Sequence, residues 1–444
     1  MKDSTRTLID TMDNRLSLEL QKRLFEENQK RQAELADEEL AIESPQSFYT
    51  ATPGTSAALS PQQPPTTTTT TTEYGEWIAQ KELQVAKEVE LDWSGRGQHV
   101  EYDIQEHVPL TAVNVLGYSA TALVESVECR RILLARKSIQ LNRRVKLADV
   151  IGEVEHLHRL RHRHVIRFVG SYLQGRTFAM LLYPTADSHL GTYMDNLSYQ
   201  VSLFPDYTHT RLALARLENA FLCLTEALAY IHSQGIKHLD IKPSNILISK
   251  NYSPHDPLKI YITDFGISRE FTAEEGSETD TPTARTPKWA SPEIIANEQY
   301  GRASDIFSLG CVFSEISTVL VAESLDNYRA ARASNGGSDA FHSNLPQVYN
   351  WLELLRSRGF IGGYMTRNSV DSLLVCVKNM LARDPAQRPT AEHLLEYIKG
   401  KRWVRNVLPC GEEGPEPFKL TDHQELVRRL EEYQKKHLSK ADET

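Results

Sequence analysis

Two short motifs constrain this chain more than any other feature. The sequence HLDIKPSNIL occupies residues 238–247, and the triplet DFG follows at residues 264–266. Transfer of a phosphoryl group needs a carboxylate that orients and deprotonates the attacking hydroxyl, oxygen ligands for a magnesium ion, and a cation near the transferred phosphate. The two motifs contain residue types suited to each role. The candidates are Asp240 as the carboxylate, Asn245 and Asp264 as the magnesium ligands, and Lys242 as the cation.

This pair of motifs resembles the signature of the eukaryotic protein kinases, H-x-D-x-K-P-x-N with a downstream D-F-G, and the resemblance extends over residues 102–407. It implies a two-lobed α+β fold, with a small β-rich N-lobe at about 102–184 and a larger helical C-lobe at about 185–408. The hydrophobic patterns follow the same order. Runs typical of strands lie at 113–127, 131–139, 165–173 and 178–184, and apolar residues at helical spacing lie at 212–234 and 370–381.

The resemblance also assigns residues to ATP binding. Lys137 matches the lysine that holds the α- and β-phosphates, and Glu153 follows sixteen residues later on a helical pattern. We predict Glu153 rather than Glu155 as its ion-pair partner, because of the distance to the turn HRHVI that ends the helix. The residues expected around the adenine are Ala135 in the pocket wall, Tyr183 at the hinge and Leu181 at the back of the pocket.

The loop that covers the nucleotide is the main departure from the family. Its members have G-x-G-x-x-G-x-V, whereas this chain has LGYSATALV at residues 116–124 and keeps only the first glycine, Gly117. Glycine lets backbone amides approach phosphates without interference from a Cβ. Serine and alanine are the smallest replacements, so we expect a looser or slower phosphate clamp rather than a dead site. Leu116, Gly117 and Val124 remain the candidates for contact with the nucleotide.

A second group of matches concerns the C-lobe. The sequence TPKWASPE at residues 286–293 resembles the A-P-E segment that closes a kinase activation segment, with serine in place of the usual alanine. The resemblance implies that Thr286 contacts the catalytic aspartate and lysine. It also implies that Asp305 anchors the catalytic loop and that Arg388 pairs with Glu293. These would be buried charges, and a buried charge needs a partner.

Substrate class and regulation follow from the catalytic loop. Lys242 followed by Pro243 resembles the serine/threonine kinases, whereas tyrosine kinases have an Ala-Arg pattern, so the expected acceptor is a Ser or Thr hydroxyl on a protein. Leu239 replaces the arginine that normally pairs with a phosphorylated activation loop, and leucine cannot form a charge-assisted bond. We therefore hypothesise that activity does not depend on loop phosphorylation through this contact. The loop hydroxyls are Ser277, Thr279, Thr281 and Thr283.

The flanks differ from this region in composition. Residues 1–43 have leucines at four-residue spacing among many charges, which is typical of an amphipathic helix but ends too soon to support more than a weak coiled-coil prediction. This helix is a possible partner-binding segment. Residues 44–72 are rich in Pro, Ser and Thr and are predicted to be a disordered linker. The remaining flanks are a charged connecting segment at 73–101 and a charged tail at 409–444.

Composition limits the partners and the compartment. The chain has 50 Lys and Arg against 59 Asp and Glu, a net charge of −9, which argues against a broad basic face for nucleic acid. No apolar segment is predicted to span a membrane. The five cysteines are scattered without a C-x-x-C pair, so we expect a reducing compartment, cytoplasmic or nuclear.

Two insertions are predicted as exposed loops, at residues 250–257 and 322–343. A cluster of histidines precedes the strand-like run at residues 165–173, but without cysteines or paired carboxylates it is interpreted as helix-face and turn residues rather than a metal site. The four are His156, His158, His162 and His164.

Three functions compete at this stage. The first is an active protein serine/threonine kinase that uses ATP and Mg2+ and acts on protein substrates. The second is a pseudokinase scaffold, which the eroded glycine loop and Leu239 favour but the intact Lys137, Asp240 and Asp264 disfavour. The third, a small-molecule phosphotransferase, is disfavoured by the segment at residues 264–293, which resembles the part of protein kinases that positions polypeptide substrates.

Overall fold

The computed structural model describes residues 72–81, 83, 91–118, 122–143, 145–203, 208–249, 258–266, 269–270, 287–358 and 367–401. The predicted N-terminal helix, the charged tail, the 250–257 insertion, and the linker apart from Thr72 lie outside the described residues. Contacts divide the chain into Met1–Thr69 and Thr70–Thr444, and everything below concerns the second unit.

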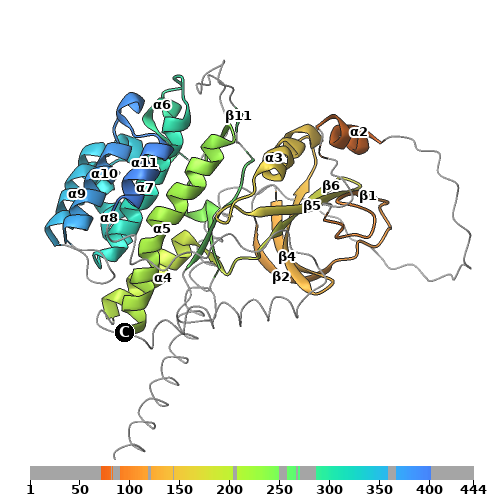
Figure 1. Ribbon diagram of the computed structural model, residues 1–444, viewed down its shortest axis with the longest axis horizontal. Coiled ribbons are helices and arrows are strands. Elements are labelled where there is room, and N and C mark those ends of the chain that lie inside the picture. The colour runs from red at the N-terminus through yellow and green to blue at the C-terminus, as the bar shows by residue number, and fades with distance from the viewer. Residues whose placement is uncertain are drawn as a thin grey trace, which may run out of the picture. The chain divides into compact units, whose positions relative to one another are not determined.

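A six-stranded sheet with the order β1-β5-β6-β4-β3-β2 forms the N-lobe (Figure 1). The four strand-like runs predicted from the sequence are confirmed, because they become β2 to β6. Neighbouring strands from β5 to β2 are antiparallel, whereas β1 joins the edge parallel to β5. The strands are β1 (His99–Tyr102), β2 (Thr111–Tyr118), β3 (Ala122–Cys129), β4 (Ile132–Gln140), β5 (Arg167–Gln174) and β6 (Thr177–Tyr183).

Both faces of this sheet are covered. Successive side chains of a strand point to opposite faces, so Ala135 of β4 joins the main core while Leu134 joins a second, smaller core. Helix α3 (Leu147–Arg159) packs on the main-core face, beside α2 (Glu73–Gln80) (Figure 1). Trp93 and residues of β1 pack on the other face. Helix α2, Trp93 and strand β1 are therefore an integral part of the lobe.

The C-lobe is mainly helical, as predicted. The predicted helix at 212–234 lies in α5, and the one at 370–381 in α10. The helices are α4 (Leu190–Leu203), α5 (Thr208–Ser233), α6 (Pro292–Ile295), α7 (Arg302–Leu320), α8 (Leu325–Arg332), α9 (Leu345–Arg358), α10 (Arg367–Met380) and α11 (Ala391–Lys399). The short 3-10 turns are η1 (Pro243–Asn245), η2 (Ala333–Asn335), η3 (Phe341–Ser343) and η4 (Pro385–Gln387). The short strands are β7 (Ser188–His189), β8 (Ile236–Lys237), β9 (Ile246–Ser249), β10 (Lys259–Ile262) and β11 (Arg269–Glu270).

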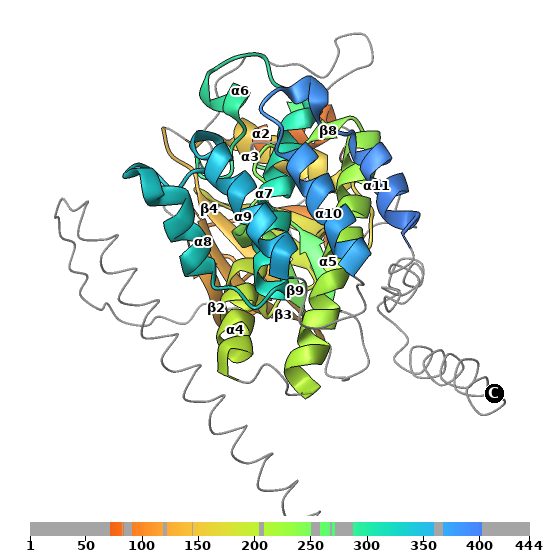
Figure 2. The same ribbon diagram turned by 90° about the vertical axis from the view of Figure 1, so that its left-hand side faces the viewer.

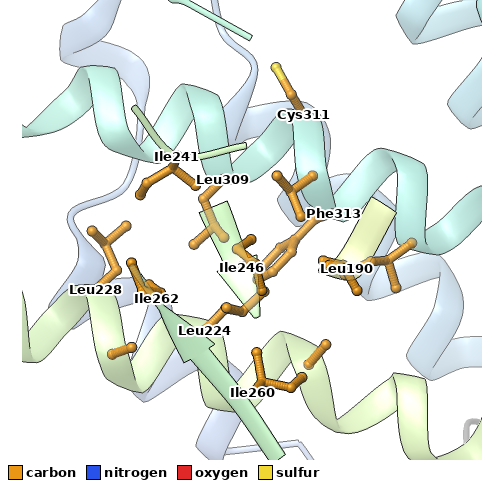
Figure 3. Close-up of a cluster of buried hydrophobic side chains, with 14 of the residues drawn as sticks. Leu190, Leu224, Leu228, Ile241, Ile246, Ile260, Ile262, Leu309, Cys311 and Phe313 are labelled. Atoms are coloured by element: carbon orange, nitrogen blue, oxygen red, sulfur yellow. The ribbon is translucent and has the colours of Figure 1, made fainter. Parts of the chain in front are cut away.

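Helix α7 runs through the centre of this lobe, in contact with α4, α5, α8, α9 and α10 (Figure 2). Its side chains meet those of α5, β9 and β10 in the core (Figure 3), where Leu309 and Phe313 lie close to Ile246. By length and composition it is the one described helix apolar enough to cross a membrane, but 94% of its apolar window is buried inside the protein. Core helices show the same apolar composition.

The prediction of an exposed loop at 322–343 is wrong. This stretch contains α8, and its side chains Tyr328 and Phe341 are fully buried. Arg332, 2% exposed, lies between them, with its guanidinium 4.3 Å from the Tyr328 ring centre and 4.1 Å from that of Phe341. Aromatic faces attract a guanidinium, so the arginine can be buried in this element.

Candidate active site

Asp305, in the first turn of α7, holds the catalytic loop through hydrogen bonds to its backbone. This carboxylate is fully buried and accepts hydrogen bonds from the backbone N–H groups of His238 (2.9 Å) and Leu239 (2.7 Å). Its other partner is the Nε2 atom of His232 at 2.9 Å. Burial alone would raise the pKa of Asp305, but the His232 contact holds it below its usual value. The predicted anchoring contact is thus present.

Leu239 departs from the backbone geometry that leucine prefers. Its φ is +66°, in the left-handed region that non-glycine residues rarely adopt. Asp305 accepts hydrogen bonds from the N–H of this strained residue and from that of the preceding His238. Its side chain is 5% exposed and packs in a separate cluster with Ala290, Ile294 and Tyr300. The contact between the catalytic loop and the segment after residue 286 is therefore apolar.

Three polar side chains of the catalytic loop converge. Asn245 uses its amide nitrogen to donate to the Oδ2 atom of Asp240 (2.9 Å) and to the Asp240 backbone carbonyl (3.0 Å). The Lys242 Nζ atom lies 2.8 Å from the same Oδ2. The turn η1 begins at Pro243 and brings Asn245 back toward Asp240. One carboxylate, one cation and one amide are thereby held together.

Lys137 joins the two lobes. Its Nζ atom donates to Glu153 Oε1 of α3 and to Asp264 Oδ1 of the C-lobe, each at 2.8 Å. Burial alone would lower the pKa of Lys137, but the two carboxylates raise it above its usual value, so the lysine stays charged. Lys137 in turn lowers the pKa of Asp264, against the effect of burial. The predicted pairing of Lys137 with Glu153 is present, whereas Glu155 pairs with Lys81.

Asn245 and Asp264 are suitable for a magnesium ion. The amide nitrogen of Asn245 is already engaged by Asp240, which leaves the amide oxygen as the atom available to a cation. Asp264 uses Oδ1 for Lys137, and its side chain is 42% exposed. Carboxylate and amide oxygens are the donors that Mg2+ prefers. Within the described part of the chain, no group of three or more His, Cys, Asp or Glu side chains could hold a metal ion.

Comparison with known proteins identifies this arrangement. A family model described as "Protein kinase domain" matches residues 113–398, more than half of the chain. The chain belongs to the protein kinase family. It is 26% identical over 265 residues to mitogen-activated protein kinase kinase kinase A of Dictyostelium discoideum, covering 58% of this chain and 24% of that relative.

Other relatives are similar over comparable lengths. Identity is 28% over 260 residues to mitogen-activated protein kinase kinase kinase YODA of Arabidopsis thaliana, with the same shares of 58% and 24%. It is 27% over 287 residues to serine/threonine-protein kinase PAK 4 of Mus musculus, covering 63% of this chain and 40% of the relative. The aligned region spans about a quarter of the first two relatives, so the similarity concerns the kinase domain.

Strand register places the predicted nucleotide contacts of this kinase domain in a row. Gly117 of β2 pairs with Val124 of β3. Val124 also pairs with Lys137 of β4, and Lys137 pairs in turn with Met180 of β6. Leu116 lies in an irregularity of β2 beside Gly117, and its side chain is exposed. The two missing glycines would lie at Ser119, which is outside the described residues, and at Ala122, which begins β3.

Two of the residues predicted around the adenine, Leu181 and Tyr183, need correction. Ala135 lies opposite Leu182, and both belong to the main core, on the face that carries Lys137. Leu181 points to the opposite face and joins the smaller core, so Leu182, not Leu181, occupies the predicted position behind the adenine. Tyr183 ends β6, but its side chain lines an apolar pocket with Leu134, on the smaller-core face. Only the backbone at Tyr183 remains a candidate adenine contact.

The predicted ion pair between Glu293 and Arg388 is present in the kinase domain and buried. Arg388 donates from Nη1 and Nη2 to the two carboxylate oxygens of Glu293, at 2.7 and 2.9 Å, and the Ser304 hydroxyl donates to Oε1 at 2.8 Å. Burial would raise the pKa of Glu293, but Arg388 holds it below its usual value. Thr286 lies outside the described residues.

Some functional residues were missed from the sequence. His232 supports Asp305, yet in the sequence it is one polar residue near the end of a long helix and carries no distinguishing signal. The histidine cluster has ordinary contacts: His162 stacks on Tyr230 with ring centres 4.9 Å apart, and His164 Nδ1 lies 3.0 Å from the Ile260 carbonyl oxygen.

Proposed function

We propose that this chain is a protein serine/threonine kinase that transfers the γ-phosphoryl group of ATP to Ser or Thr hydroxyls of protein substrates. The observation that carries the proposal is the position of Lys137 between Glu153 and Asp264, at 2.8 Å from each. This is the arrangement in which the lysine can hold nucleotide phosphates while Asp264 remains beside the catalytic loop. The names of the relatives, all protein kinases, support the same function.

Each residue has a defined role in the proposed reaction. Asp240 orients the acceptor hydroxyl and takes its proton as the oxygen bonds to the γ-phosphorus, and the bond to the β–γ bridging oxygen breaks to leave ADP. Lys242, 2.8 Å from Asp240, balances negative charge on the transferred group. Lys137 holds the α- and β-phosphates. Asn245 and Asp264 would hold Mg2+, which would screen the phosphate charges when bound.

The acceptor class depends on Lys242 and the proline that follows it. We infer Ser and Thr acceptors because this loop resembles that of serine/threonine kinases, and PAK 4 is named as one. The pseudokinase alternative is disfavoured because each charged group that turnover requires is in place and paired. We also infer an intracellular, reducing location, because the five cysteines are scattered along the sequence without a C-x-x-C pair.

The test uses the purified full chain with Mg2+, radiolabelled ATP and a mixture of generic protein acceptors. We expect phosphoserine or phosphothreonine in the wild type and a loss of about 10²- to 10⁴-fold for Asp240→Asn, as for removal of a general base. The matched control is Asp326→Asn, an exposed carboxylate on α8. Phosphate transfer that is equal in Asp240→Asn and the wild type, or absent from both, would refute the proposal.

A further inference from the structure

Helix α2 and strand β1, which precede β2 in the sequence, lie close to α3, the helix that carries Glu153. The family model begins at residue 113, so α2 and β1 lie outside the part of the chain that it matches. Figure 1 shows α2 beside α3, at the edge of the sheet where β1 is added. The contacts of this segment indicate a role in the position of α3.

The first contact is an ion pair at the end of α2. Lys81 Nζ lies 2.7 Å from Glu155 Oε2, and Glu155 is two residues beyond Glu153 on α3. Tyr74, Ile78 and Leu83 are buried in the same core as the apolar side of α3. Helix α2 therefore holds α3 by apolar packing on one side and by a charge pair at its rim.

The second contact is a pair of hydrogen bonds at the Ser171 hydroxyl of β5. The Ser171 hydroxyl lies 2.8 Å from the Tyr74 hydroxyl of α2 and 2.8 Å from Nδ1 of His99 in β1. Ser171 is completely buried. The His99 ring stacks on Phe168 at 5.7 Å and faces His158 of α3 at 6.5 Å. One serine thus links α2, β1 and β5, and His99 extends this contact to α3.

The third contact is a close approach at Gly170. A Cβ atom on Gly170 would lie 2.5 Å from the Gln98 carbonyl oxygen and 2.5 Å from Nε1 of Trp93. Ser171 N–H donates to the same Gln98 carbonyl at 3.0 Å, and Gln98 donates back to the Val169 carbonyl at 2.9 Å. The segment lies so close to β5 here that only glycine fits beneath it.

We propose that Tyr74, Lys81 and His99 are positioning residues for phosphoryl transfer, because they hold α3 where Glu153 reaches Lys137. This inference rests on the proposed kinase function. A displacement of α3 would break the 2.8 Å contact between Glu153 and Lys137. Displacements of about 1 Å in a catalytic arrangement can reduce rates by about 100-fold. Tyr74, Lys81 and His99 therefore act on the reaction through the position of α3, without contact to the nucleotide.

Charge reversal provides the sharpest test. In the full chain, Lys81→Glu should lower kcat/KM for ATP by about five-fold or more, because it replaces an ion pair with a repulsion. The double variant Lys81→Glu with Glu155→Lys restores the pair in reverse and should recover most of the loss. The control is Arg96→Ala, which removes an exposed ion pair between Arg96 and Glu106 that does not involve α3.

Amide hydrogen exchange separates this proposal from the proposed function. Exchange in α3 should be faster in Lys81→Glu than in Arg96→Ala or the wild type, whether or not the chain phosphorylates anything. Gly170→Ala, which should push the segment off β5, should accelerate exchange in both α3 and β1. Unchanged α3 exchange and unchanged kcat/KM in Lys81→Glu would overturn the positioning role. An inactive wild type would instead refute the kinase function.

Discussion

At the residue scale, Leu239 supports the hypothesis that activity does not depend on phosphorylation of the activation loop. It directly precedes Asp240, its own N–H and that of His238 donate to Asp305, and its side chain packs with Ala290, Ile294 and Tyr300. A phosphate on the activation loop would find no cation at this position. The apolar contact links the catalytic loop to the segment around Ala290 without any modification.

We therefore predict that the activation-loop hydroxyls are dispensable. A quadruple alanine variant should retain turnover within about ten-fold, or less than about 1.4 kcal/mol in activation free energy. Steady-state kinetics on the wild type and the variant, both treated with phosphatase, measure this. A much larger loss in the variant, or a strong gain from acidic substitutions, would contradict it. The four residues are Ser277, Thr279, Thr281 and Thr283.

The buried pair of Arg388 and Glu293 should be costly to break. Arg388→Met leaves the Glu293 carboxylate buried without its cation, so we predict a loss of about 3–5 kcal/mol in the free energy of unfolding. The midpoint of thermal unfolding should fall by on the order of 10 °C. Arg329→Met is the control, because Arg329 pairs with Asp326 at the surface and should contribute less than about 1 kcal/mol. Equal losses in both would exclude a special role for the buried pair.

His99 makes stability depend on pH. Burial, with nearby His158, lowers its pKa from 6.5 to about 4 in the folded protein. Between these two pH values His99 is protonated in the unfolded chain but neutral in the folded protein. The free energy of unfolding therefore falls as the pH drops from 6.5 toward 4. From pH 7 to pH 5 this amounts to about 2 kcal/mol. Urea unfolding of wild type and His99→Gln across this range should show a shallower pH dependence in the variant, and parallel curves would contradict the prediction.

At the scale of elements, two glycines in helices behave in opposite ways. A Cβ on Gly310 of α7 would lie 2.9 Å from the Cβ of Met380, where α7 crosses α10. A Cβ on Gly152 of α3 would meet nothing within 4 Å. Alanine is more favourable than glycine inside a helix by up to about 1 kcal/mol at either position. The two substitutions should therefore differ only because space for a Cβ is present at Gly152 and absent at Gly310.

We predict that Gly310→Ala destabilises the protein by about 1–3 kcal/mol through overpacking. Gly152→Ala should stabilise it by about 0.5–1 kcal/mol. Denaturant midpoints of the two variants against wild type test both. If Gly310→Ala is stabilising, α7 and α10 can move apart more easily than their packing indicates.

Elements also show what the sequence could and could not predict. Strands β2 to β6 and helices α5 and α10 have clear periods and were predicted. The misplacement of Leu181 has a physical cause: residues 178–182 of β6 are buried on both faces and all apolar, so no alternation reveals which face each side chain takes. The error at α8 also has a physical cause: charged side chains are usually exposed, whereas Arg332 is buried between two aromatic rings.

The catalytic residues were predictable because their chemistry requires particular side chains at fixed spacing. Asp240, Asn245 and Asp264 are defined within two short motifs, and Lys137 with Glu153 within one strand and one helix. The supports were not predictable, because Lys81 and His99 act through residues more than 50 positions away. A single sequence does not indicate which charged or polar residues, far apart along the chain, form a contact in the folded protein.

On the scale of the whole molecule, hydrogen bonds and ion pairs link the two lobes in addition to the covalent connection that follows β6. Ile166 N–H donates to the Ile262 carbonyl at 3.0 Å, and Ile262 N–H donates to the His164 carbonyl at 2.8 Å. Arg163 pairs with Glu226 of α5 nearby, at 2.5 Å. These links tie the connection after α3 to the C-lobe, and Lys137 ties the sheet to Asp264.

Because the candidate nucleotide contacts come from both lobes, ATP should stabilise the molecule as a unit. At 100 times its dissociation constant, a nucleotide analogue with Mg2+ should add about 2.7 kcal/mol to the free energy of unfolding. Lys137→Met should remove most of this gain, as measured by thermal unfolding with and without the analogue. Arg96→Ala, far from the phosphate contacts, should keep the full gain. A gain of the same size in Lys137→Met would contradict the assigned role of the lysine.

The parallel pairing of β1 with β5 has a practical consequence for anyone who expresses part of this chain. A fragment cut at residue 113, where the family match begins, would start inside β2 and would lack β1. The hydrogen-bonding edge of β5 and the apolar surface around Tyr172 would then face solvent. Unprotected strand edges pair with other chains, so such a fragment should aggregate, whereas one that begins before α2 should remain monodisperse.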